Sequence, residues 1–142
     1  MPLLLEIVTP ERLVFSETVD AVVLPGSEGE LGVLPHHAPL VSTLGFGELR
    51  IRTGGTEESF AIAGGFLQVL PDKVVVMAET ADIASEIDLE KAAEARREAE
   101  RALESGYHEG ADLSLARAAL QQALLRERLA TRRHREGPRH RG

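Results

Sequence analysis

The sequence predicts a two-domain β + α fold, in which an N-terminal flattened β-sandwich or barrel is followed by a C-terminal antiparallel α-helical hairpin. Residues 1–85 are rich in valine, glycine and proline, which suit pleated strands and their turns. From Glu86 onward valine is absent, whereas alanine and arginine, two good helix formers, occur eleven times each. We therefore expect domains at residues 1–86 and 87–135, and a disordered tail at 136–142.

Short apolar segments separated by turn residues predict the strands of the first domain. Some of these segments are continuous apolar runs, as in buried strands, and others alternate polar and apolar side chains, as in strands with one solvated face. We expect strands at residues 3–8, 19–24, 48–52, 57–62, 66–70 and 74–77. Regularly spaced short strands are typical of a sandwich or flattened barrel.

The second domain is expected to start at Asp88, a residue type that caps helix N-termini well, and its first helix to run to about Glu104. Charged residues, Arg96 among them, are assigned to the solvated side of this helix. After a loop at 105–112, a second helix is expected to run to about Arg133. The predicted contact between the two helices consists of Leu89, Ala92, Ala93, Ala99 and Leu103 from the first helix and Leu113, Ala116, Leu120, Ala123 and Leu124 from the second.

The predicted contact between the helices is rich in alanine. Burial of an alanine methyl contributes well under the ~1.5–3 kcal/mol that is typical of leucine or valine. A weak contact suits a hairpin that opens and binds elsewhere, but the same composition also describes a small hairpin that stays closed.

Several functional classes lack the residues that they require. The chain has no cysteine, so disulfides, thiolate metal sites and cysteine nucleophiles are excluded. No Gly-x-Ser-x-Gly, His-Glu-x-x-His or phosphate-loop motif is present. His36 and His37 would point to opposite faces of an extended segment, and Gly64-Gly65 is typical of a turn or bulge. We expect a noncatalytic protein that requires no cofactor or metal and has no membrane-spanning segment.

The charge distribution is uneven. Residues 126–142 contain seven arginines against two glutamates, although the whole chain has a formal net charge of −7. A basic end can bind an acidic protein surface, nucleic acid or anionic lipid, or it can be a solvated helix end. An arginine-tailed adaptor that binds nucleic acid is therefore one functional alternative, which the acidic body and the lack of interleaved aromatic residues disfavour.

Residues 29–40 carry the most specific motif, with the sequence Gly-Glu-Leu-Gly-Val-Leu-Pro-His-His-Ala-Pro-Leu. This segment resembles a signature in the sandwich domain of the epsilon subunits of bacterial F-type ATP synthases. Residues 8–10, 63–69 and 87–88 resemble further family segments in the same order, so the resemblance extends over about residues 3–133.

The resemblance implies a noncatalytic subunit of the central stalk, which rotates with the gamma subunit and the c-ring. It also implies a peripheral location at the cytoplasmic face of the bacterial plasma membrane. Glu30 and His37 correspond to the loop that lies toward the c-ring. From the residues alone, Glu30 could be a solvated turn residue, and His37 could fix its loop by hydrogen bonding.

The resemblance further implies that the two helices can extend into the catalytic alpha/beta hexamer and inhibit ATP hydrolysis. The residues placed to contact an acidic segment of a catalytic beta subunit are Arg126, Arg128, Arg132 and Arg133. Surface ion pairs contribute about 0–1 kcal/mol each, so only a cluster of them could shift the equilibrium usefully.

Some family members bind ATP through an Ile-Asp-x-x-Arg-Ala motif, and residues 87–92 of this chain are Ile-Asp-Leu-Glu-Lys-Ala. The implied ligands are Asp82, Asp88, Lys91, Ala92 and Arg126. Lysine at 91 loses the planar fork of arginine, and Glu98 and Gln122 stand where basic ligands are expected. ATP as a regulatory ligand is therefore expected to bind weakly or not at all, with Asp88 acting as a helix cap in either case.

Overall fold

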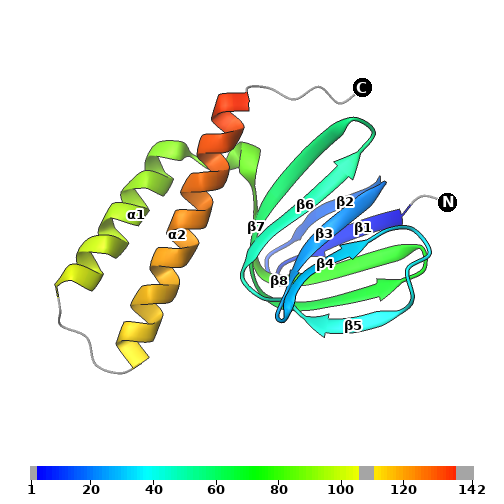
Figure 1. The fold of residues 1–142 in the computed structure, drawn as a ribbon, viewed down its shortest axis with the longest axis horizontal. Coiled ribbons are helices and arrows are strands. Elements are labelled where there is room, and N and C mark those ends of the chain that lie inside the picture. Colours follow the sequence, from blue (N-terminus) through cyan, green and yellow to red (C-terminus); the bar gives the residue numbers. More distant parts are fainter. Residues whose placement is uncertain (1–2, 106–110, 137–142) are drawn as a thin grey trace. The chain divides into compact units, whose positions relative to one another are not determined.

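The computed structural model describes residues 3–105 and 111–136 of the chain. These residues divide into a sheet unit and a helical unit, with the division between Ile83 and Ala84. The strands of the sheet unit (Figure 1) are β1 (Leu3–Val8), β2 (Leu13–Val19), β3 (Ala21–Gly26), β4 (Gly29–Val33), β5 (Leu40–Thr43), β6 (Gly47–Thr53), β7 (Thr56–Leu70) and β8 (Lys73–Ile83). The expected β-rich first domain and helical second domain are both present.

The strands form one sheet in the order β2-β1-β8-β7-β6-β3-β4, and β5 pairs with β7. All pairings are antiparallel except that between β1 and β8, which is parallel. Figure 1 shows this sheet folded over into two layers. The long strand β7 serves both layers, because its first half pairs with β6 and its second half with β5.

The bend in β7 lies at Gly64 and Gly65, which have φ angles of 67° and 113°. Such positive values suit glycine, since it has no Cβ to clash with the backbone. The sequence predicted two strands with a turn or bulge between them. The structure instead has one continuous 15-residue strand that bends at the two glycines.

The expected strand at residues 19–24 is not a single strand, because Val19 ends β2 and Ala21 begins β3. Asp20 between them is anchored across the sheet unit. Its backbone N–H donates to the carbonyl of Arg52 at 2.8 Å, and its Oδ2 accepts from the N–H of Gly54 at 2.7 Å. The chain therefore changes strand at Asp20, within the apolar run. The periodicity of the side chains alone does not predict this change.

The interior of the sheet unit is filled from alternate positions along the strands. Leu3, Leu5 and Ile7 of β1 are fully buried, as the period of two predicts. Phe15 and Phe60 meet edge to face, with ring centroids 5.6 Å apart and planes at 78°. Aromatic pairs in this arrangement contribute about 0.5–1.5 kcal/mol beyond their area burial.

The helical unit contains a short 3-10 turn, Ala84–Glu86, and the helices α1 (Leu89–Glu104) and α2 (Ala111–Glu136). The 3-10 turn packs on α2. The sequence predicted that the second helix ends at about Arg133, but it extends to Glu136. No glycine or proline occurs within residues 111–136 to end it earlier. Most of the expected loop and the tail at 137–142 lie outside the described residues. Within the described ranges, neither helix is long and apolar enough to cross a membrane.

Candidate partner-binding sites

Large apolar side chains are exposed on one face of the sheet unit. Met77 on β8 lies directly opposite Phe66 on β7 and Val8 on β1, and Val8 lies opposite Leu13 on β2. Residues directly opposite in neighbouring strands project from the same face of a sheet. Leu13, Met77 and Phe66 expose 54%, 46% and 55% of their surface, so this face is the outer one.

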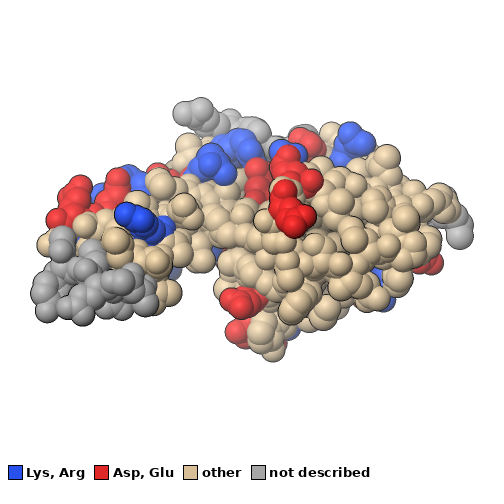
Figure 2. Space-filling model, turned by 60° about the horizontal axis from the view of Figure 1, so that its bottom comes forward, with Lys and Arg blue, Asp and Glu red and all other residues tan. Residues whose placement is uncertain are grey.

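The same row continues onto β5. Phe66 lies opposite Thr43, and Val41, two residues before Thr43, projects from the same side of the strand. Val41 is 69% exposed. We call the set Val8, Leu13, Val41, Phe66 and Met77 the apolar stripe. It crosses five strands, and Figure 2 shows a broad uncharged surface on the sheet unit. Contiguous exposed apolar side chains mark sites where partners bind.

Glu30 lies on β4 and is exposed. Its Oε2 is 3.3 Å from Nη2 of Arg50 on β6. Both side chains are well exposed, so this ion pair contributes little to stability. Glu30 therefore lies on a strand, not in the turn considered from the sequence, and its side chain is largely solvated.

His37 lies in the segment between β4 and β5. Its Nδ1 is 2.7 Å from the carbonyl oxygen of Ala38, so the proton on Nδ1 donates to that oxygen. The preceding residue, His36, has φ 69° and donates its backbone N–H to the carbonyl of Pro71 at 2.6 Å. The loop-fixing hydrogen bond considered for His37 is therefore present.

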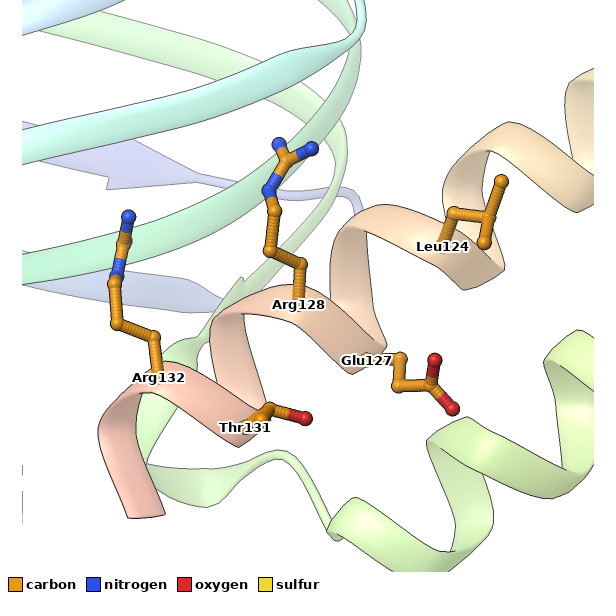
Figure 3. Close-up of a pocket in the computed structure, with 5 residues that line it drawn as sticks. All are labelled: Leu124, Glu127, Arg128, Thr131 and Arg132. Carbon is orange, nitrogen blue, oxygen red and sulfur yellow. The ribbon is translucent and has the colours of Figure 1, made fainter. Parts of the chain in front are cut away.

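The four arginines predicted to contact a catalytic subunit all lie on α2, but not on one side of it. Helical positions four apart lie on the same side, as do positions seven apart. Arg128 and Arg132 therefore form one pair, and Arg126 and Arg133 another. In Figure 3, Arg128 and Arg132 project together beside a hollow lined by Leu124, Glu127, Arg128, Thr131 and Arg132. Of these four arginines, Arg128 is exposed, whereas the other three are half-buried.

The contact between the helices contains a charge that the sequence analysis assigned to the solvated side. Arg96 of α1 donates from Nε to Oε1 and Oε2 of Glu127 on α2, at 2.9 and 3.0 Å. Its Nη1 donates to Oε1 of Glu100 at 2.5 Å. The hydrogen bond to Glu127, and then that to Glu100, raises the pKa of Arg96 above its ordinary value. The surface assignment of Arg96 was therefore wrong.

The spacing could have indicated this position for Arg96. The residue lies four positions after Ala92 and seven after Leu89, on the stripe that the apolar residues define. It was placed on the solvated side with the other charged residues, and its partner lies 31 residues away. Leu124, in contrast, was assigned to the contact but is 42% exposed. Among the side chains of α2 that the structure describes, the buried ones are Ala123, Leu125, Leu129 and Ala130.

The residues implied for ATP binding are divided between the units. Asp82 lies on β8, whereas Asp88, Lys91, Ala92 and Arg126 belong to the helical unit. Oδ1 of Asp88 accepts from the backbone N–H of Lys91 at 3.1 Å, so the predicted helix cap is confirmed. Among the described residues, no group of three or more acidic or histidine side chains could hold a metal ion.

Comparison with known proteins identifies the family. The protein-family model for the β-sandwich domain of ATP synthase delta/epsilon chains matches residues 2–84. The model of the long α-helix domain of the same chains matches residues 85–131. The chain belongs to the ATP synthase delta/epsilon chain family. The sandwich and the helical pair described above are the two domains of this family.

Individual members of the delta/epsilon family agree with this assignment. The chain is 48% identical over 129 residues to the ATP synthase epsilon chain of Dehalococcoides mccartyi strain BAV1, covering 91% of this chain and 92% of the relative. It is 52% identical over 126 residues to the epsilon chain of Syntrophobacter fumaroxidans, covering 89% and 93%.

Solved structures support the same delta/epsilon fold. A chain in the Euglena gracilis mitochondrial ATP synthase, a structure of OSCP, F1 and c-ring, matches with a TM-score of 0.75 and 30% identity. This match covers 93% of the present chain and 82% of the Euglena chain. A chain of the Tetrahymena thermophila mitochondrial ATP synthase shares the fold, with a TM-score of 0.58 at 15% identity and coverage of 93% and 96%.

Proposed function

We propose that this chain is a noncatalytic subunit of the central stalk of a proton-translocating rotary ATP synthase. In this proposal the sheet unit anchors the chain, and the helical unit inhibits ATP hydrolysis. The observation that carries the proposal is the apolar stripe, which gives a member of this family a surface suited to permanent docking. The solved structures to which the chain is similar come from ATP synthases, one from a central stalk with c-ring.

The gamma subunit is the proposed partner of the apolar stripe. Leu13, Phe66 and Met77 are each about half exposed in the chain alone, so a partner can remove considerable apolar surface from water. Complete burial of a large apolar side chain contributes ~1.5–3 kcal/mol relative to leaving it exposed. Three such side chains in one row can therefore form the centre of a stable interface.

The c-ring is the proposed partner of Glu30 and His37. Glu30 lies on β4 beside Arg50, and the loop side chain of His37 is oriented by the carbonyl of Ala38. A loop held in one conformation loses less conformational entropy when it binds. Through this contact the chain would be peripheral to the membrane, at the cytoplasmic face of the bacterial plasma membrane.

The catalytic alpha/beta hexamer is the proposed partner of α2. Arg128 and Arg132 present two guanidinium groups on one side of the helix (Figure 3), and Arg126 and Arg133 present two more on another side. Guanidinium groups suit bidentate contact with carboxylates. An acidic segment of a catalytic beta subunit could thus bind the arginine pair on either side of the helix.

The test measures ATP hydrolysis by the reconstituted hexamer with gamma. A variant with alanine at Arg126, Arg128, Arg132 and Arg133 is compared with the parent chain and with a control that has alanine at Arg97, Arg101 and Arg117. The control arginines are exposed and lie elsewhere on the two helices. We expect the first variant to bind gamma and relieve inhibition, and the control to inhibit like the parent. Equal hydrolysis with all three chains would contradict the inhibitory role.

A further inference from the structure

A polar contact occupies the middle of the helical hairpin. Arg96 and Glu127 have only 27% and 24% of their side-chain surface exposed, and they connect residues that are 31 positions apart in the sequence. Near Arg96, α1 offers small side chains, namely Ala92, Ala93 and Ala99. The Arg96–Glu127 contact is therefore a specific interaction that joins the two helices.

The geometry orients Arg96 in two directions. Its Nε–H is shared between both carboxylate oxygens of Glu127, at 2.9 and 3.0 Å. On its own helix, Nη1 donates to Glu100, one turn later. The guanidinium is thus bonded both within α1 and across to α2. A shift of one helix along the other by a single turn would break the bonds to Glu127.

An ionic contact between helices differs from an apolar one in the cost of opening. When an apolar contact separates, apolar surface becomes exposed to water at about 25 cal/mol per Å². When Arg96 and Glu127 separate, each group regains hydration, which offsets most of the lost attraction. A partly exposed ion pair therefore helps to define the closed arrangement without making it permanent.

We propose that Arg96 and Glu127 form a reversible latch that sets the register of the two helices and the fraction of chains whose hairpin is closed. This inference rests on the proposed function, in which α2 leaves the hairpin to act on the hexamer. Glu127 points toward α1, away from Arg128 and Arg132 (Figure 3). The latch therefore holds α2 through a side chain that is not one of the four arginines that the proposed function requires.

The test measures the distance between the helices in the isolated full chain. Because the chain contains no cysteine, cysteines introduced at Glu98 and Gln121 can be labelled selectively with spin labels. Both positions are exposed and lie outside the contact. The distance distribution gives the open fraction directly, with no ATP synthase present, so a failure of hydrolysis inhibition would not affect this result.

Four variants are compared with the parent. R96Q and E127Q should each raise the open fraction up to roughly fivefold, as expected for loss of a partly exposed ion pair. R97Q, which removes the neighbouring exposed arginine, should leave the distribution unchanged. The charge exchange R96E/E127R should restore part of the closed fraction, since it rebuilds the pair in the opposite sense.

Two outcomes would overturn the latch. One is an unchanged distance distribution in both R96Q and E127Q. The other concerns single variants that lose helical circular dichroism. If the R96E/E127R chain is then no more helical than either single variant, the two residues act independently. Recovery of helicity and short distances in the exchanged chain would support the latch.

Discussion

Gly65 lies against the backbone of Met77, so closely that a Cβ on Gly65 would be 1.9 Å from the carbonyl oxygen of Met77. The same glycine has φ 113°. This approach lets β7 bend and serve both layers of the sheet unit. The bend also positions Phe66 and Met77 opposite each other on the outer face. The fold and the apolar stripe therefore depend on one residue without a side chain.

The substitution G65A is expected to lower the free energy of unfolding of the sheet unit by about 2–6 kcal/mol, since backbone strain and overpacking each cost about 1–3 kcal/mol. Urea unfolding monitored by circular dichroism measures the change. G55A is the matched control, because a Cβ at Gly55 would have no atom within 4 Å. Equal midpoints for the two variants would contradict the proposed bend constraint.

The apolar stripe can be tested without disturbing the core. Phe66 and Met77 are about half exposed, so F66S/M77S should cost about 1 kcal/mol of stability per site, roughly half of the value for a fully buried side chain. Binding to immobilised gamma subunit should weaken at least roughly tenfold, as expected when interface anchors are removed. The surface binding assay includes L115S, since Leu115 is 69% exposed on α2.

If L115S weakens gamma binding as much as F66S/M77S does, the effect is one of general surface hydrophobicity, and the stripe is not the docking site. Retained gamma affinity in F66S/M77S would argue against the stripe in the same way.

The cap at Asp88 gives a third prediction. D88A removes the oxygen that accepts from the N–H of Lys91, and loss of such a cap costs about 0.5–2 kcal/mol. Thermal melting followed at the helical circular dichroism signal should therefore move to lower temperature. D88N can still accept this hydrogen bond and should melt near the parent, whereas an equally large shift in D88N would assign the effect to charge.

The sequence predicted the class of each unit well, because local composition and periodicity determine it. The prediction failed where a contact with a residue distant in the sequence determines a strand boundary or the position of a side chain. Asp20 separates β2 from β3 through Arg52 and Gly54, and Arg96 enters the helix contact through Glu127. Such contacts depend on tertiary pairing, which a window of neighbouring residues does not contain. The apolar stripe was missed for the same reason, since its members come from five strands.

ATP binding provides the last prediction. Asp88 already caps α1 through Lys91, and lysine at 91 offers a point charge where a planar fork would bind phosphate oxygens in pairs. Isothermal titration of the full chain with ATP should therefore give weak or no binding, with a dissociation constant of about 1 mM or above, near −4 kcal/mol. K91R should bind ATP more tightly than the parent, and K91Q should not. Tight binding by the parent chain would show that lysine suffices, and that the helical unit responds to nucleotide despite its departures from the family motif.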